Sequence, residues 1–258
     1  MEAGKYKILF SDLDGTLIFS ASRRGVGDFV IERRNGEPIS CITARQAKLF
    51  PQLANVIPVT TRSIEQYRRI EFAKFGFKPR YALCSNGGTL LVDGEVDEEW
   101  SRWSLGITEE CAEELSRFRE LMERDPRRSF EVRLVDGLFL FTKSSEPAET
   151  LKYLGQGKLC ESFFTGEKVY TVPKKLNKGA AVKRLAKRLE LSEFAAAGDS
   201  LMDLPMLNAA KTAVFTENIT TELVTANEKI KCPRKGFPEF VTEFAGGRRC
   251  SFDQYSGG

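Results

Sequence analysis

Two carboxylates separated by one residue follow an apolar run near the start of the chain. Residues 6–10 read as a buried strand, and Asp12 and Asp14 come directly after it, before Gly15 and Thr16 break the strand pattern. Burying two like charges side by side is costly unless a cation or a shared proton relieves their repulsion. The spacing therefore points to a metal ion, a phosphoryl group or both. An ordinary strand followed by an Asp-Gly turn would also fit this stretch alone.

Other strands end in the same way. Short apolar runs at residues 55–59, 81–84 and 194–197 lead into small polar residues, and helices are expected between them. Alternating strands and helices form a parallel sheet, in which ligands bind beyond the carboxyl ends of the strands. The sequence therefore predicts an α/β fold with a doubly wound parallel sheet. The polar residues expected at its ligand edge are Thr60-Thr61-Arg62, Ser85-Asn86-Gly87-Gly88 and Gly198-Asp199-Ser200-Leu201-Met202-Asp203.

The middle of the chain follows a different pattern. Asp93-Gly94 and Asp136-Gly137 are turn signals between adjacent strands, and helices are expected from Thr108 to about 125 and over residues 147–154. Adjacent hairpin strands with helices between them suit an α+β insert rather than a continued parallel sheet. We expect a core of residues 1–95 and 173–258 and an inserted domain of residues 96–172. Its expected strands cover residues 130–135, 138–142, 161–164 and 168–172.

A further hairpin is predicted beside the first strand. Asn35-Gly36 lies between residues 29–34 and 38–41, which is a strong hairpin signal. Such a hairpin could be a flap over a site at the end of the first strand or a surface feature with no role. The remaining expectations are helices over residues 43–54, 63–75, 178–189, 220–226 and 238–244, a strand over 213–215 and a loose tail at 256–258.

Composition excludes several classes of function. The chain contains no histidine, which rules out Ser-His-Asp and Cys-His catalysis and histidine metal sites. The net charge of +3 is small and its basic residues are scattered, so nucleic acid is not an expected partner. No stretch approaches the length of a membrane span, and the start lacks a signal peptide's apolar core. We expect a cytoplasmic protein with reduced thiols at Cys41, Cys84, Cys111, Cys160, Cys232 and Cys250.

The polar residues at the strand ends suit phosphoryl chemistry. Carboxylates without histidine or paired cysteine favour a hard cation, for which Mg²⁺ is the default. A hydroxyl at Thr60 and an ammonium at Lys178, at the start of an expected helix, suit phosphoryl oxygens. In such a site a carboxylate can be the nucleophile. Alternatively, Lys178 could be an ordinary surface lysine, and Asp203 an acid in a helix turn.

These motifs resemble those of the haloacid dehalogenase superfamily. Asp12-Leu13-Asp14-Gly15-Thr16-Leu17 looks like its first motif, and Thr60-Thr61-Arg62 is similar to the second, with Thr61 where glycine is usual. Lys178-Gly179 resembles the third motif and residues 198–203 the fourth. The insert between the second and third motifs resembles the α/β cap of the Cof-type, or subclass IIB, sugar phosphatases. The resemblance covers nearly the whole chain and implies a Rossmann-like core with this cap.

The resemblance also implies roles for the site residues. Asp12 would attack phosphorus to form an aspartyl-phosphate, and Asp14 would protonate the leaving oxygen and then activate water. Mg²⁺ would be held by the Asp12 carboxylate, the Asp14 main-chain carbonyl and Asp199, with Asp203 assisting through water or through a neighbouring ligand. Thr60 and Lys178 would hold the phosphoryl oxygens. Substrate contacts are expected from Thr61, Arg62, Asn86 and Arg133, although Arg62 could form a surface ion pair and Asn86 could only shape a turn.

The expected function is Mg²⁺-dependent hydrolysis of a small phosphorylated metabolite, most simply a sugar phosphate. A monomer or small homo-oligomer is expected, with no nucleic acid or membrane as partner. A phosphomutase of the phosphomannomutase type is the alternative enzyme, since it shares this class of cap. A regulatory or phosphate-binding module with Asp12 as phosphoryl acceptor is a third hypothesis, against which the acid at Asp14 and the large insert both count.

Overall fold

The computed structural model describes residues 8–247 of the 258. The chain divides into two compact units, one formed by residues 1–95 and 178–258 and the other by residues 96–177. The second unit therefore extends a few residues past the expected limit at 172. The start of the first expected strand, Cys250 and the tail at 256–258 lie outside the described residues.

A five-stranded parallel sheet forms the centre of the first unit. The strand order is β15-β14-β13-β1-β5, and every neighbouring pair is parallel. Phe10 of β1 is flanked by Ala196 and Ile57 and packs edge-on against Phe194, with ring centroids 5.0 Å apart. The small side chains of β13 leave room for that ring. The strands are β1 (Leu9–Ser11), β5 (Val56–Pro58), β13 (Ala195–Gly198), β14 (Thr212–Thr216) and β15 (Glu228–Cys232).

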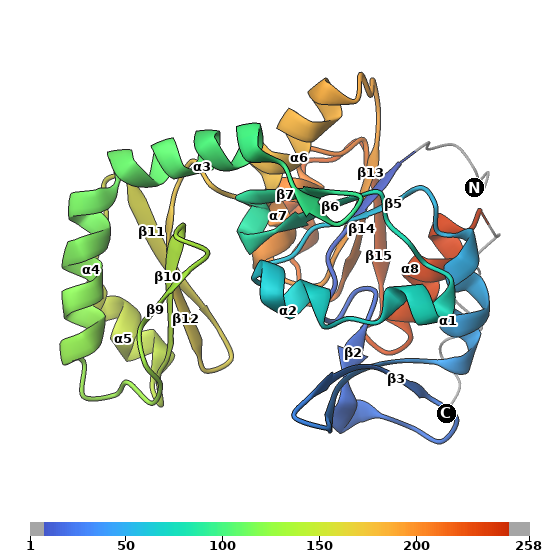
Figure 1. The fold of residues 1–258 in the computed structure, drawn as a ribbon, viewed down its shortest axis with the longest axis horizontal. Helices are drawn as coiled ribbons and strands as arrows, with labels where there is room; N and C mark the ends of the chain where they lie inside the picture. Colours follow the sequence, from blue (N-terminus) through green and yellow to red (C-terminus); the bar gives the residue numbers. More distant parts are fainter. Residues whose placement is uncertain (1–7, 248–258) are drawn as a thin grey trace. The chain divides into compact units, whose positions relative to one another are not determined.

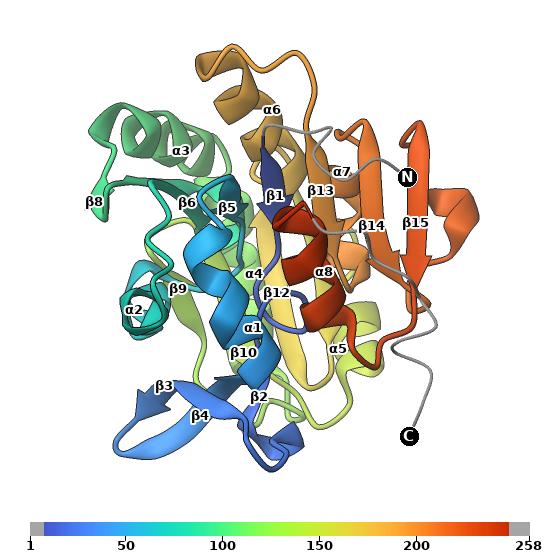
Figure 2. The same cartoon turned by 90° about the vertical axis from the view of Figure 1, so that its right-hand side faces the viewer.

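Helices cover both faces of this sheet, as the doubly wound fold requires. In Figure 1 the sheet is seen nearly edge-on, with α1 and α8 on one side and α6 and α7 on the other. Buried Gln46 joins α1 to α8, because its Nε2 donates to the main-chain oxygens of Leu17 and Pro238 and to Oγ1 of Thr242. Figure 2 shows α1 and α8 in front of the strands. These helices are α1 (Ala44–Leu49), α6 (Lys178–Arg188), α7 (Leu204–Leu207) and α8 (Phe237–Ala245).

The predicted hairpin at Asn35-Gly36 is present. Both turn residues have a positive φ, of 51° and 84°, which the type I′ turn of a two-residue hairpin requires. The hairpin consists of β3 (Phe29–Arg34) and β4 (Glu37–Ile42), and the short strand β2 (Phe19–Ser20) pairs with β4. Together they form a three-stranded sheet in the order β2-β4-β3.

The helix predicted over residues 63–75 begins as expected but is much shorter. Helix α2 (Ile64–Arg68) is short, and the chain then leaves the helical path to pair with β3. Ile70 forms an antiparallel bridge with Glu32, and the Glu71 N–H donates to Ile31. A 3₁₀ turn over Phe72–Phe75 follows. Tertiary pairing with the hairpin thus overrides the local helix propensity.

Other predictions for the first unit also differ from the structure, including the helix expected over residues 43–54, which ends at Leu49. The strand β6 (Tyr81–Cys84) joins the parallel sheet through one bridge, Val59 to Leu83, and then pairs antiparallel with β7 (Thr89–Val92), to which β8 (Glu95–Val96) is added. The helix expected over residues 220–226 is only a 3₁₀ turn, Thr221–Leu223. The edge strand β15 was not predicted, although its buried Ile230 and Cys232 alternate with charged residues.

The second unit is an antiparallel sheet packed against helices. Its strand order is β11-β12-β10-β9, and apolar side chains of α4 and α5 pack on one face of the sheet. Helix α3 was not predicted, although Asp97 caps its start by accepting from the Trp100 N–H. The elements are α3 (Glu98–Glu110), α4 (Ala112–Arg124), β9 (Arg133–Val135), β10 (Phe139–Lys143), α5 (Pro147–Leu154), β11 (Cys160–Thr165) and β12 (Lys168–Pro173).

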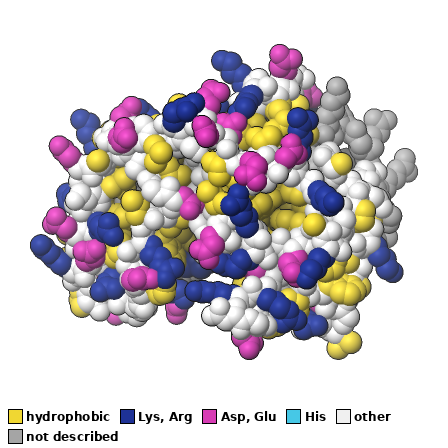
Figure 3. Space-filling model, viewed as in Figure 1, with side chains coloured by type: hydrophobic (Ala, Val, Ile, Leu, Met, Phe, Trp, Pro, Cys, Tyr) yellow, Lys and Arg dark blue, Asp and Glu magenta, His cyan; other side chains and the backbone are white. Residues whose placement is uncertain are grey.

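The surface carries mixed charges. On the face drawn in Figure 3, Lys and Arg side chains are interspersed with Asp and Glu. Within residues 8–247, no helix combines the length and the apolar character needed to cross a bilayer.

Candidate active site

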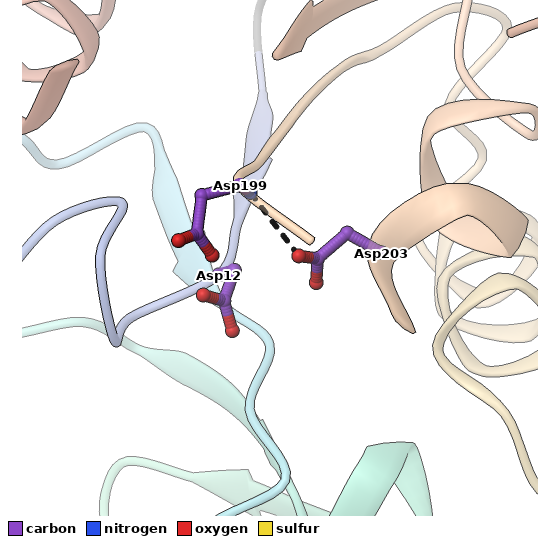
Figure 4. A group of neighbouring side chains, drawn as sticks. All are labelled: Asp12, Asp199 and Asp203. Atoms are coloured by element: carbon purple, nitrogen blue, oxygen red, sulfur yellow. Dashed lines mark hydrogen bonds between the residues drawn. The ribbon is translucent and has the colours of Figure 1, made fainter. Parts of the chain in front are cut away.

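Three aspartates meet at the carboxyl ends of two neighbouring strands. Asp12 follows β1 and Asp199 follows β13, and the parallel register pairs Ser11 with Ala197, so the two acids emerge side by side. Asp203 lies in the turn that follows Asp199. One carboxylate oxygen from each of the three lies within 4.8 Å of the others. Figure 4 shows the three side chains gathered around one space.

Lys178 neutralises part of this cluster. It is the first residue of α6, and its Nζ lies 2.5 Å from Oδ1 of Asp12 and 2.6 Å from Oδ1 of Asp203. Burial alone would lower the pKa of the ammonium, but the two carboxylates outweigh it and raise that pKa above its usual value. With 2% of its surface exposed, Lys178 is not an ordinary surface lysine.

Asp203 orders the loop that carries Asp199. Its Oδ2 accepts hydrogen bonds from the main-chain N–H groups of Asp199 and Ser200 and from the Ser200 hydroxyl, at 3.0–3.2 Å. Gly198 permits this packing, because an added Cβ would lie 2.3 Å from the Cβ of Asp203. Asp203 is therefore more than an acid in a helix turn: it connects Lys178 to the Asp199 loop.

The cluster holds more negative charge than Lys178 can balance. Burial and the neighbouring carboxylates raise the pKa of Asp12 well above its ordinary value, against the opposing effect of Lys178. Burial and the Asp203 charge raise the pKa of Asp199 to about 6. Both shifts mean that burial and mutual repulsion disfavour the ionised carboxylates, more than Lys178 offsets. A cation between them would offset that repulsion.

The turn after Asp14 closes tightly on the cluster. Gly15 has a φ of +89°, and a Cβ added there would lie 2.3 Å from Oδ2 of Asp199. The main chain of residues 14–15 therefore lies directly against that carboxylate. Oxygen ligands without histidine or cysteine, gathered in a partly buried space, suit Mg²⁺. Asp12, Asp199 and the adjoining main chain thus fit the ion that the sequence predicts.

Arg62 makes a bidentate ion pair with Asp14. Its Nε and Nη2 each lie 2.7 Å from one carboxylate oxygen of Asp14. The other side of the guanidinium contacts Glu32 at 2.8 Å and the Ser40 hydroxyl at 3.1 Å. Arg62 was expected either to contact a substrate anion or to form a surface ion pair. The structure shows an ion pair, and its partner is the site residue Asp14. Only 11% of the arginine side chain is exposed, so the pair does not lie on the open surface.

The loops that follow β5 and β6 are tied together around Thr60. The Thr60 hydroxyl accepts from the Arg62 N–H at 3.1 Å, and its main-chain oxygen accepts from the Asn86 N–H at 2.9 Å. Accepting through oxygen leaves the hydroxyl proton of buried Thr60 able to donate to a ligand. Asn86 has a left-handed backbone, with φ 59°, so it shapes the turn as one hypothesis held. Thr61 has no positive φ, so glycine is not required there.

Arg133 belongs to the second unit. It lies on β9, where it pairs with Glu131, and its guanidinium lies 4.7 Å from the centre of the Phe130 ring. About half of its side chain is exposed. Its predicted contact with a substrate anion stays a prediction.

Sequence reasoning missed several residues that support the site. Thr16 is part of the first motif, and its hydroxyl donates to Oδ2 of Asp12 at 3.3 Å. Ser200 was visible as a serine three residues before an acid, the pattern of a capping box. Glu32 and Ser40 had no signal in the sequence, because only the folded hairpin brings them to Arg62.

Comparison with known proteins identifies the family. A family model described as sucrose-6F-phosphate phosphohydrolase matches residues 5–235. The chain belongs to this family. It is accordingly a phosphatase of the haloacid dehalogenase type, acting on phosphoric monoesters, with the Cof-type resemblance confirmed. A search of curated proteins gives no significant match.

Solved structures of low sequence identity share the fold. The sucrose-phosphatase from Synechocystis sp. PCC6803, in complex with sucrose and phosphate, is 17% identical and superimposes with a TM-score of 0.63 over 93% of this chain and 98% of that one. A haloacid dehalogenase-like hydrolase from B. subtilis gives 20% identity and a TM-score of 0.58, with 93% and 98% covered. A Thermotoga maritima protein gives 17% and 0.57, with 95% and 98% covered. The predicted α/β fold is thereby confirmed.

Proposed function

We propose that the protein is a Mg²⁺-dependent sugar phosphatase that works through an aspartyl-phosphate at Asp12. The observation that carries the proposal is the buried cluster in which Lys178 bridges Asp12 and Asp203 while Asp199 lies alongside. Phosphoryl transfer needs an anionic nucleophile beside concentrated positive charge, and few structural roles would bring three aspartates, two of them buried, together with a buried lysine.

The first half-reaction would transfer the phosphoryl group to Asp12. A carboxylate oxygen of Asp12 attacks phosphorus, and the bond from phosphorus to the sugar oxygen breaks as Asp14 gives that oxygen a proton. Lys178 and the Thr60 hydroxyl would hold the phosphoryl oxygens. Mg²⁺ bound to Asp12, Asp199 and the Asp14 main-chain oxygen would supply charge that offsets the repulsion between nucleophile and phosphate.

The second half-reaction would restore Asp12. Asp14, now ionised, takes a proton from a water molecule that attacks the aspartyl-phosphate, and inorganic phosphate leaves. The Arg62 contact describes Asp14 in this ionised form. The same residue thus serves as acid and then as base, as microscopic reversibility of proton transfer allows.

The second unit would serve as a cap that selects the sugar. Phe163, Tyr170, Phe141 and Arg133 are cross-strand neighbours in one row of its sheet, on the face opposite α4 and α5. The rings of Phe163 and Tyr170 are stacked with centroids 5.3 Å apart, and those of Tyr170 and Phe141 are 5.4 Å apart. An aromatic row with a cation at its end would suit the apolar face and the polar edge of a sugar phosphate.

The family description makes sucrose 6F-phosphate the first substrate to test, and the sucrose and phosphate bound by the Synechocystis protein support that choice. Phosphate release should be measured from sucrose 6F-phosphate and a panel of other sugar phosphates, with Mg²⁺ and then with a chelator. We expect turnover of at least one sugar phosphate, lost on chelation. A mutase would instead convert a hexose 1-phosphate to its 6-phosphate without net release of phosphate, and a regulatory module would turn over neither.

A further inference from the structure

A buried carboxylate on the β3–β4 hairpin is linked to Asp14, the proposed acid and base, through a single intervening side chain. Glu32 is fully buried, and its Oε2 accepts from Nη1 of Arg62 at 2.8 Å and from the hydroxyl of Ser40 at 2.7 Å. Arg62 in turn binds Asp14 through its opposite edge. The chain of contacts from the hairpin to the site is therefore Glu32, Arg62, Asp14.

This arrangement leaves Arg62 no freedom to turn. All five N–H donors of its guanidinium have acceptors: Nε and one Nη2 proton on Asp14, the second Nη2 proton on the Ser40 hydroxyl, and the two Nη1 protons on Glu32 and on the main-chain oxygen of Gln66. Because the guanidinium is planar and rigid, fixing one edge on Glu32 fixes the direction of the other edge.

Asp14 needs such support more than the other acids do. Its side chain is 55% exposed, whereas Asp12 and Asp203 are buried and held by Lys178. An exposed carboxylate in a turn would sample several rotamers, and general acid catalysis requires the proton within hydrogen-bond reach of the leaving oxygen. Arg62 contacts both oxygens of Asp14, and such a bidentate contact fixes the plane of the carboxylate.

We propose that Glu32 is a positioning residue for the reaction: by fixing Arg62 it holds the carboxylate of Asp14 in the orientation that transfers a proton to the leaving oxygen. The β3–β4 hairpin would then support catalysis through the buried side chain of Glu32, whether or not the hairpin covers the site. The inference rests on the proposed function, because it concerns the step assigned to Asp14.

The test exploits the different needs of two leaving groups. Nitrophenolate departs from p-nitrophenyl phosphate with little need of a proton, whereas a sugar alkoxide needs one. kcat/KM reports the steps up to formation of the aspartyl-phosphate, so it isolates the acid role of Asp14. Glu32→Gln keeps the shape of the side chain and removes its charge. It should lower kcat/KM for a sugar phosphate that the wild-type enzyme hydrolyses by about tenfold or more, out of the ~10²–10⁴-fold that general acid catalysis supplies.

For p-nitrophenyl phosphate the same variant should lose less than about threefold, since little of the general-acid contribution applies. Arg69→Gln is the matched control, because Arg69 is the other arginine on Glu32, at 3.2 Å, and does not contact Asp14. It should leave both kcat/KM values near wild type. Circular dichroism and thermal unfolding check that each variant is folded. If Glu32→Gln does not fold, Ser40→Ala removes one acceptor from Arg62 and should give the same selective loss at smaller size.

The outcomes distinguish failure of the proposed phosphatase activity from failure of the positioning role of Glu32. A wild-type protein that releases phosphate from no ester refutes the proposed function itself. An active wild type in which Glu32→Gln and Ser40→Ala lower kcat/KM equally for both substrates, or not at all, overturns the positioning role and leaves the proposed function intact.

Discussion

The ammonium of Lys178 lies 2.5 Å from Oδ1 of Asp12, although 166 positions separate the two residues in the chain. The pair is buried, and the same ammonium also lies 2.6 Å from Oδ1 of Asp203. The three residues depend on one another, since each carboxylate would be an unpaired buried charge without the lysine. The same three side chains are therefore expected to contribute both to the stability of the fold and to its activity.

Lys178→Met should destabilise the protein as well as inactivate it. Two buried carboxylates lose their partner, and breaking such a contact costs about 3–5 kcal/mol. Urea unfolding in the presence of a chelator measures this loss without compensation by a metal. Lys183→Met, on an exposed position of the same helix, is the control and should change stability little. Equal losses in the two variants would contradict the role given to the buried cluster.

Asp12→Asn and Asp14→Asn should separate the nucleophile from the acid. The first removes the attacking oxygen and a metal ligand, so turnover should fall by at least about 10⁴-fold and Mg²⁺ should bind more weakly. The second should lower turnover by about 10²–10⁴-fold. It should leave Mg²⁺ affinity nearly unchanged, because the ligand from this residue would be its main chain. Calorimetric titration with Mg²⁺ checks the affinities, and robust turnover by Asp12→Asn would remove the nucleophile assignment.

The effect of Mg²⁺ on stability should grow with pH. The pKa of Asp199 is raised from 3.8 to about 6 in the folded protein, and that of Asp12 is raised too. Folding thus favours the protonated forms, and this contribution, about 3 kcal/mol for Asp199, is complete below pH ~4 and lost as the pH rises through ~6. Mg²⁺ binds the ionised forms and should restore stability there.

Thermal unfolding with and without Mg²⁺ tests this expectation. The rise in Tm caused by the ion should be larger at about pH 7.5 than at about pH 5, where protons compete for the same oxygens. In Asp199→Asn the rise should be small at both values. An equal rise in the wild-type protein at the two pH values would speak against a metal site at Asp12 and Asp199.

Gly15→Ala should damage the site through its backbone. A methyl group there would lie 2.3 Å from Oδ2 of Asp199, at a φ of +89° that alanine rarely adopts. Gly36→Ala has a similar φ of +84° but nothing within 4 Å, so it carries the conformational cost of about 1 kcal/mol without the clash. We expect both variants to lose stability and only Gly15→Ala to lose activity and Mg²⁺ binding. Retained activity in Gly15→Ala would show that Asp199 can move freely.

Turn chemistry and strand periodicity predicted much of this fold. The hairpins at Asn35-Gly36 and Asp136-Gly137 are local features, and the residues at their turns require the conformations they adopt. Helix α3 was missed although Asp97 and two following glutamates form a start signal. The shortening of α2 could not be read locally, because its cause is the pairing of Ile70 with Glu32 on a distant strand.

The candidate site likewise contains some contacts that the sequence predicts and others that it does not. The convergence of Asp12 and Asp199 was predictable because parallel strands bring their carboxyl ends to one edge, and Lys178 reaches them from the start of α6. The contact between Arg62 and Asp14, and the support from Glu32, depend on how a hairpin folds back over the loop after β5. No spacing rule in the sequence contains that information.

The inserted unit also sets the order in which the protein can assemble during synthesis. Strand β1 lies between β5 and β13, and the second of these partners is translated only after residues 96–177. A nascent chain that has reached the insert therefore lacks the partners of Phe10 in β13 and of one edge of β1. Such an edge is a template for wrong pairing, so the unfinished chain is open to misassembly until β13 has been made.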